Sequence, residues 1–258
     1  MTTAPVLLTD EIVDRTPNHM ILWLDKHIGN IENCQLLKRS FITAMHPASG
    51  LFERNVDRSD IDRSIQADTS ILVQMGEVEF MFQPFVDLEK CFLTIEQNRH
   101  KRIFLITSGS KGRILIPGLL AHFYETFIPG YSIYVFCGKM NMIPTEFQGD
   151  PTNDWAMNYD DNLLMYNHEI HLLNRMVLDI AMYFGEKGEA LEASNQLENA
   201  RQYYGWSKKM WERYATLVQR NPMRPKIDEM TQHINQIDQK INSRMEEGDD
   251  DRVGVPTD

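Results

Sequence analysis

Residues that could bind an anion follow several short apolar runs of this sequence. Asp25 and Asp87 each end such a run, Ser108-Gly109-Ser110-Lys111-Gly112 follows a third, and Lys139 follows a fourth. Backbone N–H groups where a helix begins, together with the helix dipole, attract phosphate and carboxylate groups. We therefore predict a ligand-binding rim that consists of Asp25, Asp87, Ser108, Gly109, Ser110, Lys111 and Lys139. The same glycine-rich segment would also serve as a plain turn between a strand and a helix, so both interpretations stay open.

Alternating strands and helices must position this rim. The apolar runs predict short strands at Met20–Leu24, Glu79–Val86, Ile103–Thr107, Ser132–Cys137 and Asn162–Tyr166. Apolar residues spaced three and four apart predict helices at Asn30–Met45, Leu88–Asn98 and Arg113–Phe127. Asp87 is the expected N-cap of the second of these helices, and Pro117 is expected in the first turns of the third.

This alternation predicts an α/β domain over residues 19–167, after a lead-in at 1–18. We expect a parallel sheet of about five strands, covered by helices on both faces, in the flavodoxin-like order 2-1-3-4-5. The carboxyl ends of its strands would then meet at one edge, where the predicted rim lies. Residues 46–79 fit no simple period and are predicted to be an insertion, with Ser70–Gln74 as an extra edge strand.

Residues 168–220 have the pattern of a helical hairpin. An apolar stripe runs from Ile170 to Phe184, Gly188 is expected to end the first helix, and Ala193–Val218 is predicted to be the second. Small and large residues, including Gly188 and Tyr204, fall near the positions that a tetratricopeptide unit uses. A plain helical hairpin packed on the sheet is the preferred alternative.

Residues 221–245 are predicted to form a short coiled-coil-like helix. Its apolar residues alternate spacings of three and four, as in a heptad seam: Ile227, Met230, Ile234, Ile237 and Ile241. The seam predicts self-association or binding of a protein partner, and the alternative is a helix docked on its own domain. Residues 246–258 carry six acidic residues and one arginine, so we expect a disordered acidic tail.

Composition excludes several classes of protein. The formal net charge of -11 over 258 residues disfavours binding to nucleic acid or to an anionic membrane surface. Neither a signal peptide nor a membrane-spanning run is expected. Three widely spaced cysteines, Cys34, Cys91 and Cys137, suit buried thiols in a reducing compartment, so we expect a cytoplasmic protein.

No catalytic motif is complete in the sequence. A phospho-receiver site needs an acidic pair on the first strand, whereas Asp25 stands between Leu24 and Lys26. His168 and His171 are three residues apart, not four as in HExxH. Glu77-Val78-Glu79 has the ExE form of arginine-type ADP-ribosyltransferases but lacks their upstream strand. No metal site and no cofactor are therefore assigned.

Several blocks resemble a eukaryotic α/β module of the TIR-like or receiver-like kind, which occurs beside ADP-ribosyltransferase or tetratricopeptide regions. The blocks are ILWLDKHIG, DRSDIDRSI, IEQNRHKRIFLITSGSKG, SIYVFCGK and NLLMYNHEIHLLNRMVLDIAMYF, within residues 19–215. Enzymatic TIR domains cleave NAD with a helix glutamate, but Glu125 lacks the expected surrounding motif. The resemblance implies a sensing or adaptor module and assigns no catalytic residue.

Two functions are consistent with these observations. The first is a non-catalytic signalling or adaptor module that binds proteins and can self-associate. The alternative is an enzyme or sensor that binds a nucleotide or phosphorylated ligand of the NAD type at the strand carboxyl edge.

Overall fold

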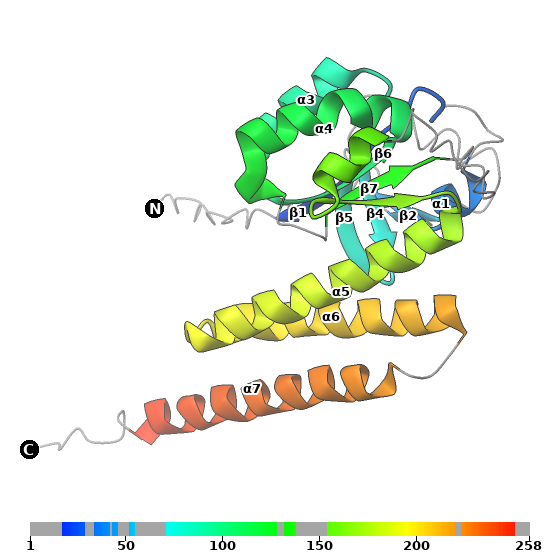
Figure 1. The fold of residues 1–258 in the computed structure, drawn as a ribbon. Coiled ribbons are helices and arrows are strands. Elements are labelled where there is room, and N and C mark those ends of the chain that lie inside the picture. Colours follow the sequence, from blue (N-terminus) through cyan, green and yellow to red (C-terminus); the bar gives the residue numbers. More distant parts are fainter. Residues whose placement is uncertain are drawn as a thin grey trace, which may run out of the picture.

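The computed structural model describes most of the chain (Figure 1). The described residues are 17–28, 34–41, 43–45, 52–54, 71–127, 132–137, 154–219 and 223–250. Lys139, most of the predicted insertion, nearly all of the predicted lead-in and residues 251–258 lie outside them.

The strands form one eight-stranded sheet in the order β3-β2-β4-β5-β1-β6-β7-β8. Five of its strands are mutually parallel: β5 (Val78–Phe85), β1 (His19–Leu24), β6 (Arg102–Ser108), β7 (Ile133–Phe136) and β8 (Leu163–Tyr166). In chain order these are the predicted second, first, third, fourth and fifth strands. The predicted α/β class and the order 2-1-3-4-5 of these five strands are therefore confirmed, whereas the predicted size of about five strands, all parallel, is wrong, because the sheet has eight strands and three of them pair antiparallel.

Three antiparallel strands extend the sheet beyond β5. They are β4 (Ile71–Met75), β2 (Thr43–Met45) and β3 (Phe52–Arg54). β4 joins β5 through Gly76 and Glu77, which both have positive φ, as a tight hairpin turn requires. The predicted strand at Ser70–Gln74 is thus real, but it lies inside the sheet and β3 forms the edge.

The predicted helix at Asn30–Met45 is wrong at its end. α1 (Gln35–Arg39) is a short helix, and Thr43–Met45 pairs with β4 as a strand. Pairing within the sheet outweighs the weak helical preference of this segment, because propensity is only a small term.

Helices cover both faces of the sheet (Figure 1). α3 (Leu88–Gln97) and α4 (Gly109–Phe123) lie on one face, above alternate β1 residues such as Met20 and Leu22. α1 and a long helical layer cover the other face, above Ile21 and Trp23. Every residue of β1 is buried, which explains why this strand reads as an unbroken apolar run.

The start of α4 corrects the predicted turn. β6 passes directly into α4 at Gly109, not at Arg113, and Pro117 lies inside the helix instead of in its first turns. Gly112 is needed for packing, because a Cβ there would lie 3.0 Å from Thr107 Cγ2. The Trp155 ring of η2 (Asp154–Tyr159) is also in contact range of that position, at 3.4 Å.

Three long helices form the layer on the opposite face. α5 (Glu169–Ala193) and α6 (Leu197–Val218) make the predicted hairpin, and α7 (Arg224–Asp250) packs on α6 as the outermost element (Figure 1). α7 continues into the predicted disordered tail as far as Asp250. The likeness to a tetratricopeptide unit stays a prediction.

Gly188 does not end α5, as the sequence predicted, but lies within it. Its missing side chain leaves room for the Tyr204 ring, since a Cβ at this position would lie 2.8 Å from Tyr204 Cδ1. The glycine therefore marks the closest approach between α5 and α6, and the helix continues to Ala193.

Replacing Gly188 with alanine should destabilise the protein by about 1–3 kcal/mol, because the new methyl group overpacks the Tyr204 ring. Gly205→Ala is the matched control: a Cβ there meets nothing within 4 Å, so the better helix propensity should stabilise the protein by about 0.5–1 kcal/mol. Urea unfolding measures both values, and equal effects of the two changes would contradict the packing role of Gly188.

Candidate functional site

The carboxyl ends of the central strands meet at one edge, as predicted. Leu24 of β1 pairs with Phe85 of β5 and with Thr107 of β6, and Ser108 pairs with Phe136 of β7. The backbone N–H of Asp25 donates to the Phe85 carbonyl at 2.9 Å. The described part of the predicted rim is thus gathered at a single edge of the sheet.

The carboxylates of this rim are engaged in local backbone hydrogen bonds. Asp25 Oδ1 accepts from the His27 N–H at 2.9 Å and stabilises the turn after β1. Asp87 Oδ1 accepts from the Lys90 N–H at 2.9 Å, so Asp87 is the predicted N-cap of α3. Among the described residues no hydrogen bond joins these two side chains to each other.

The helix start at the rim remains a candidate anion site. Ser108 makes no side-chain capping hydrogen bond to α4, and its Oγ lies 3.5 Å from Ser110 Oγ. Gly109, Ser110 and Lys111 form the first turn, whose N–H groups have no intrahelical partner. Lys139 lies outside the described residues, so its place beside this turn stays a prediction.

A cleft between α1, α5 and α6 lies at the same edge, because α1 follows β1 and α5 follows β8. Its volume is about 580 Å³, and its lining combines Arg39 and Arg213 with the apolar Leu36 and Ile170. Nε of Arg213 is buried and has no hydrogen-bond partner within the described part of the chain. Glu169 Oε2 accepts from the Leu37 N–H at 2.9 Å and ties α1 to α5. No local sequence pattern predicts this cleft, because its residues come from distant segments.

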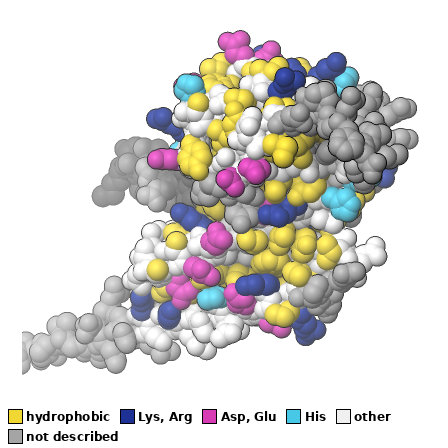
Figure 2. Space-filling model, viewed as in Figure 1, with side chains coloured by type: hydrophobic (Ala, Val, Ile, Leu, Met, Phe, Trp, Pro, Cys, Tyr) yellow, Lys and Arg dark blue, Asp and Glu magenta, His cyan; other side chains and the backbone are white. Residues whose placement is uncertain are grey.

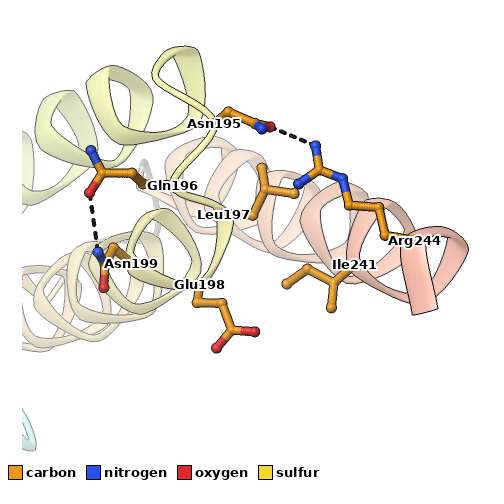
Figure 3. Close-up of a pocket in the computed structure, with 7 residues that line it drawn as sticks. All are labelled: Asn195, Gln196, Leu197, Glu198, Asn199, Ile241 and Arg244. Atoms are coloured by element: carbon orange, nitrogen blue, oxygen red, sulfur yellow. Dashed lines mark hydrogen bonds between the residues drawn. The ribbon is translucent and has the colours of Figure 1, made fainter. Parts of the chain in front are cut away.

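A second, smaller hollow lies where the α5–α6 turn meets α7 (Figure 3). Its volume is about 430 Å³, and Arg244 of α7 borders it. The Arg244 guanidinium donates to Asn195 Oδ1 at 2.6 Å. Asn195 has positive φ, which turns the chain between the helices. This hollow therefore lies where the C-terminal part of α7 is attached to the α5–α6 turn.

A buried polar network lies between the sheet and α5. Asp179 accepts from the Tyr134 hydroxyl at 3.0 Å and from Arg175 Nε at 2.8 Å. Burial raises the pKa of Asp179 to about 6, against the opposing effect of Arg175. Arg102 lies over the Tyr183 ring, 4.9 Å from its centroid, and burial lowers the arginine pKa. The spacing of Arg175 and Asp179 could have predicted their ion pair, but no sequence signal links Tyr134 to it.

His19 is a second buried titratable residue that the sequence analysis did not single out. It is fully buried at the start of β1, and its Nε2 lies 2.7 Å from the Glu79 carbonyl oxygen, to which it donates. The rings of Phe80, Phe184 and Trp206 surround it at 4.8 to 5.1 Å. Burial lowers the pKa of His19 to about 4, so it stays neutral in the folded protein at pH 7.

The residues of the incomplete catalytic motifs are exposed or have structural roles. His168 and His171 are exposed at the start of α5, while Glu169 between them bonds to α1. Glu77 is exposed in the β4–β5 turn, and Glu125 is exposed in the 3-10 segment after α4.

Comparisons with family models, with curated proteins and with solved structures found no match for this chain. Within the described residues, no helix has the length and apolar character needed to cross a bilayer. Function has to be inferred from the residues and contacts of the chain itself.

The burial of His19 predicts a pH-dependent stability. Its pKa is lowered from 6.5 to about 4, so below pH 6.5 the unfolded chain binds a proton that the folded protein does not. Stability is therefore lost as the pH falls from 6.5 toward 4, and the loss from this group should reach about 2 kcal/mol at pH 5.

Urea unfolding at pH 7 and at pH 5 measures this effect. His19→Gln keeps an amide donor for the Glu79 carbonyl but cannot titrate, so its stability should fall less between the two pH values than that of the wild type. His100→Gln, at an exposed histidine, should behave as the wild type. Equal pH dependence in the wild type and in His19→Gln would contradict the argument.

Proposed function

We propose that the protein is a non-catalytic interaction module of the signalling or adaptor type, and that α6 in its helical layer binds an amphipathic helix. The observation that carries the proposal is the packing of α7. This helix is the outermost element, and α6 is its main contact surface (Figure 1). The surface of α6 therefore already accepts one amphipathic helix.

The residues of the predicted heptad seam make this contact. Met230 and Ile237 are buried, and Ile227, Ile234 and Ile241 are half-buried against the same core. Within one chain, α7 is thus docked on its own domain, which is the alternative to self-association that the sequence left open. Self-association or partner binding through the seam would use the same surfaces, with α7 of another copy, or a partner helix of like spacing, on α6.

The few buried contacts that hold α7 on α6 favour its exchange for another helix. Two fully buried apolar side chains contribute about 1.5–3 kcal/mol each. The ion pair of Arg201 with Asp238 at the margin is largely exposed and contributes little, whereas Lys240 is exposed and pairs with Glu192, whose side chain is 19% exposed. Release of α7 therefore costs less than unfolding of the sheet, as expected for an element that opens locally.

Releasing α7 should expose the α6 surface to a helix in solution. In Ile237→Asp, a buried carboxylate disfavours docking, so a fluorescent peptide of residues 224–244 should bind this variant at least about tenfold more tightly than the wild type. Fluorescence anisotropy measures binding, and circular dichroism checks that the fold persists.

Gln239→Asp adds the same charge at an exposed position of α7 and is the matched control, which should behave as the wild type. Equal peptide affinity for all three proteins, with Ile237→Asp still folded, would reject the α6 surface as a helix-binding site.

A second candidate function is the sensing of a nucleotide or phosphorylated ligand at the carboxyl edge. It is supported by the cleft between α1, α5 and α6, whose volume suits a small ligand. The buried Nε of Arg213 lacks a partner among the described residues, and Arg39 adds a second guanidinium. Guanidinium groups are suited to phosphate because they donate two parallel hydrogen bonds.

Thermal-shift measurements with NAD, ADP-ribose and cyclic nucleotides test this second function. A bound ligand should raise the melting temperature of the wild type by about 2–4 °C or more. Arg213→Gln should abolish the rise if the ligand occupies the cleft, and Ser110→Ala should abolish it if the ligand occupies the predicted rim. The absence of any shift with every ligand would reject both sites for this class of molecule.

A further inference from the structure

Three potential metal ligands meet where α7 crosses the end of α5. Glu189 comes from α5, and Glu229 and His233 come from α7, with one ligand atom of each within 4.8 Å of the others. Glu229 and His233 are four residues apart, so they lie on the same face of the helix. We propose that these three side chains bind a divalent transition-metal ion of the Zn²⁺ class, which fastens α7 to α5.

The histidine is held in place by its neighbours. Its ring stacks on Tyr204, with centroids 4.5 Å apart and an angle of 15° between the rings. Nδ1 lies 3.6 Å from Glu192 Oε2 and makes no hydrogen bond to any described residue. The Tyr204 hydroxyl donates to the same Glu192 oxygen at 3.0 Å. The stacking on Tyr204 therefore restricts the ring, and Glu192 stands close enough to Nδ1 for a small shift to make the carboxylate–histidine hydrogen bond that is common at metal sites.

The charges around this group favour a cation. Glu189, Glu192 and Glu229 face two ammonium groups, since Lys240 donates to Glu192 at 2.7 Å and Lys226 to Glu229 at 2.8 Å. Acidic, basic and histidine side chains gather on this part of the molecule (Figure 2). One negative charge is left without a cation, because the histidine is neutral when it binds a metal.

The ligand set decides the class of metal. One imidazole with two carboxylates suits Zn²⁺ and its neighbours, whereas Mg²⁺ and Ca²⁺ take oxygen ligands alone. Tetrahedral zinc needs its ligand atoms roughly 3.3 Å apart, so the side chains must close in slightly. Glu189 is exposed, and both oxygens of Glu229 accept from the exposed Lys226 ammonium, at 3.2 and 2.8 Å, so this lysine has to move aside when a metal binds. Water would complete the coordination.

The experiment uses the full chain after treatment with a chelator. Zn²⁺ at tens of micromolar should raise its melting temperature by about 3 °C or more, since the ion binds only when α7 is docked. Mg²⁺ at the same concentration should not. Co²⁺ should give visible absorption bands stronger than those of the hydrated ion, which report its low-coordinate binding to the protein.

Variants separate this site from other metal-binding groups, including the thiols of Cys34, Cys91 and Cys137. The Glu189→Gln/Glu229→Gln double variant keeps the shape of both side chains and should lose the Zn²⁺ shift and the Co²⁺ spectrum. Glu186→Gln, at an exposed glutamate one turn earlier on α5, is the matched control and should keep both. His233→Gln should behave as the double variant.

Three outcomes would overturn the proposal. They are a wild-type melting temperature that Zn²⁺ leaves unchanged, an equal Zn²⁺ shift in the double variant, and an equal shift with Mg²⁺, which would indicate only screening of an acidic surface. If His233→Gln fails to fold, the double variant decides, because its two residues make no buried contact that glutamine cannot replace.

Discussion

The burial of β1 on both faces is the constraint on which the rest of the structure depends. This strand lies between β5 and β6, and each of its residues is buried. A strand with two apolar faces must have two covers, so helices have to pack above and below it. α3 and α4 supply one cover and the α5–α6 hairpin the other, while α7 packs mainly on α6 and adds Met230 and Ile237 to the core on that side. That division explains why one helix can be proposed to leave while the sheet stays intact.

The two faces also separate the polar groups. At the carboxyl edge, Asp25 and Asp87 follow their strands and accept hydrogen bonds from backbone N–H groups. Both carboxylates therefore stabilise the local chain. The groups with altered pKa, such as His19 and Asp179, lie on the face toward the hairpin, where burial costs most and partners are fixed. Arg213, with a buried nitrogen that bonds to no described residue, and the Glu189–Glu229–His233 group are instead near the surface. Candidate binding chemistry thus belongs to the helical layer and its junction with the sheet more than to the strand ends themselves.

Sequence patterns predicted the central strands well, because a strand buried on both faces is an unbroken apolar run. The patterns gave wrong predictions where the role of a residue depends on a contact with a residue far away in the sequence. Gly188 looked like the end of a helix but makes room for Tyr204, and Gly112 looked like a turn residue but makes room for Thr107 and Trp155. The seam from Ile227 to Ile241 has the same spacing whether it packs on its own chain or on another, so the pattern could not choose. The strand ends that carry Asp25, Asp87 and Ser108 were predicted at one edge, while the cleft beside Arg213 and the partners of His19 depend on contacts that no local pattern contains.

The uninterrupted course of α5 has one more consequence. At 25 residues it is about 37 Å long, and it runs as a single rod from the cleft beside α1 to the turn beside α7. A small tilt of its first turn therefore becomes a larger sideways displacement at its far end, as with any lever. Glu169 at one end and Glu189 and Glu192 at the other thus belong to one continuous helix, which joins the cleft beside α1 to the contact with α7.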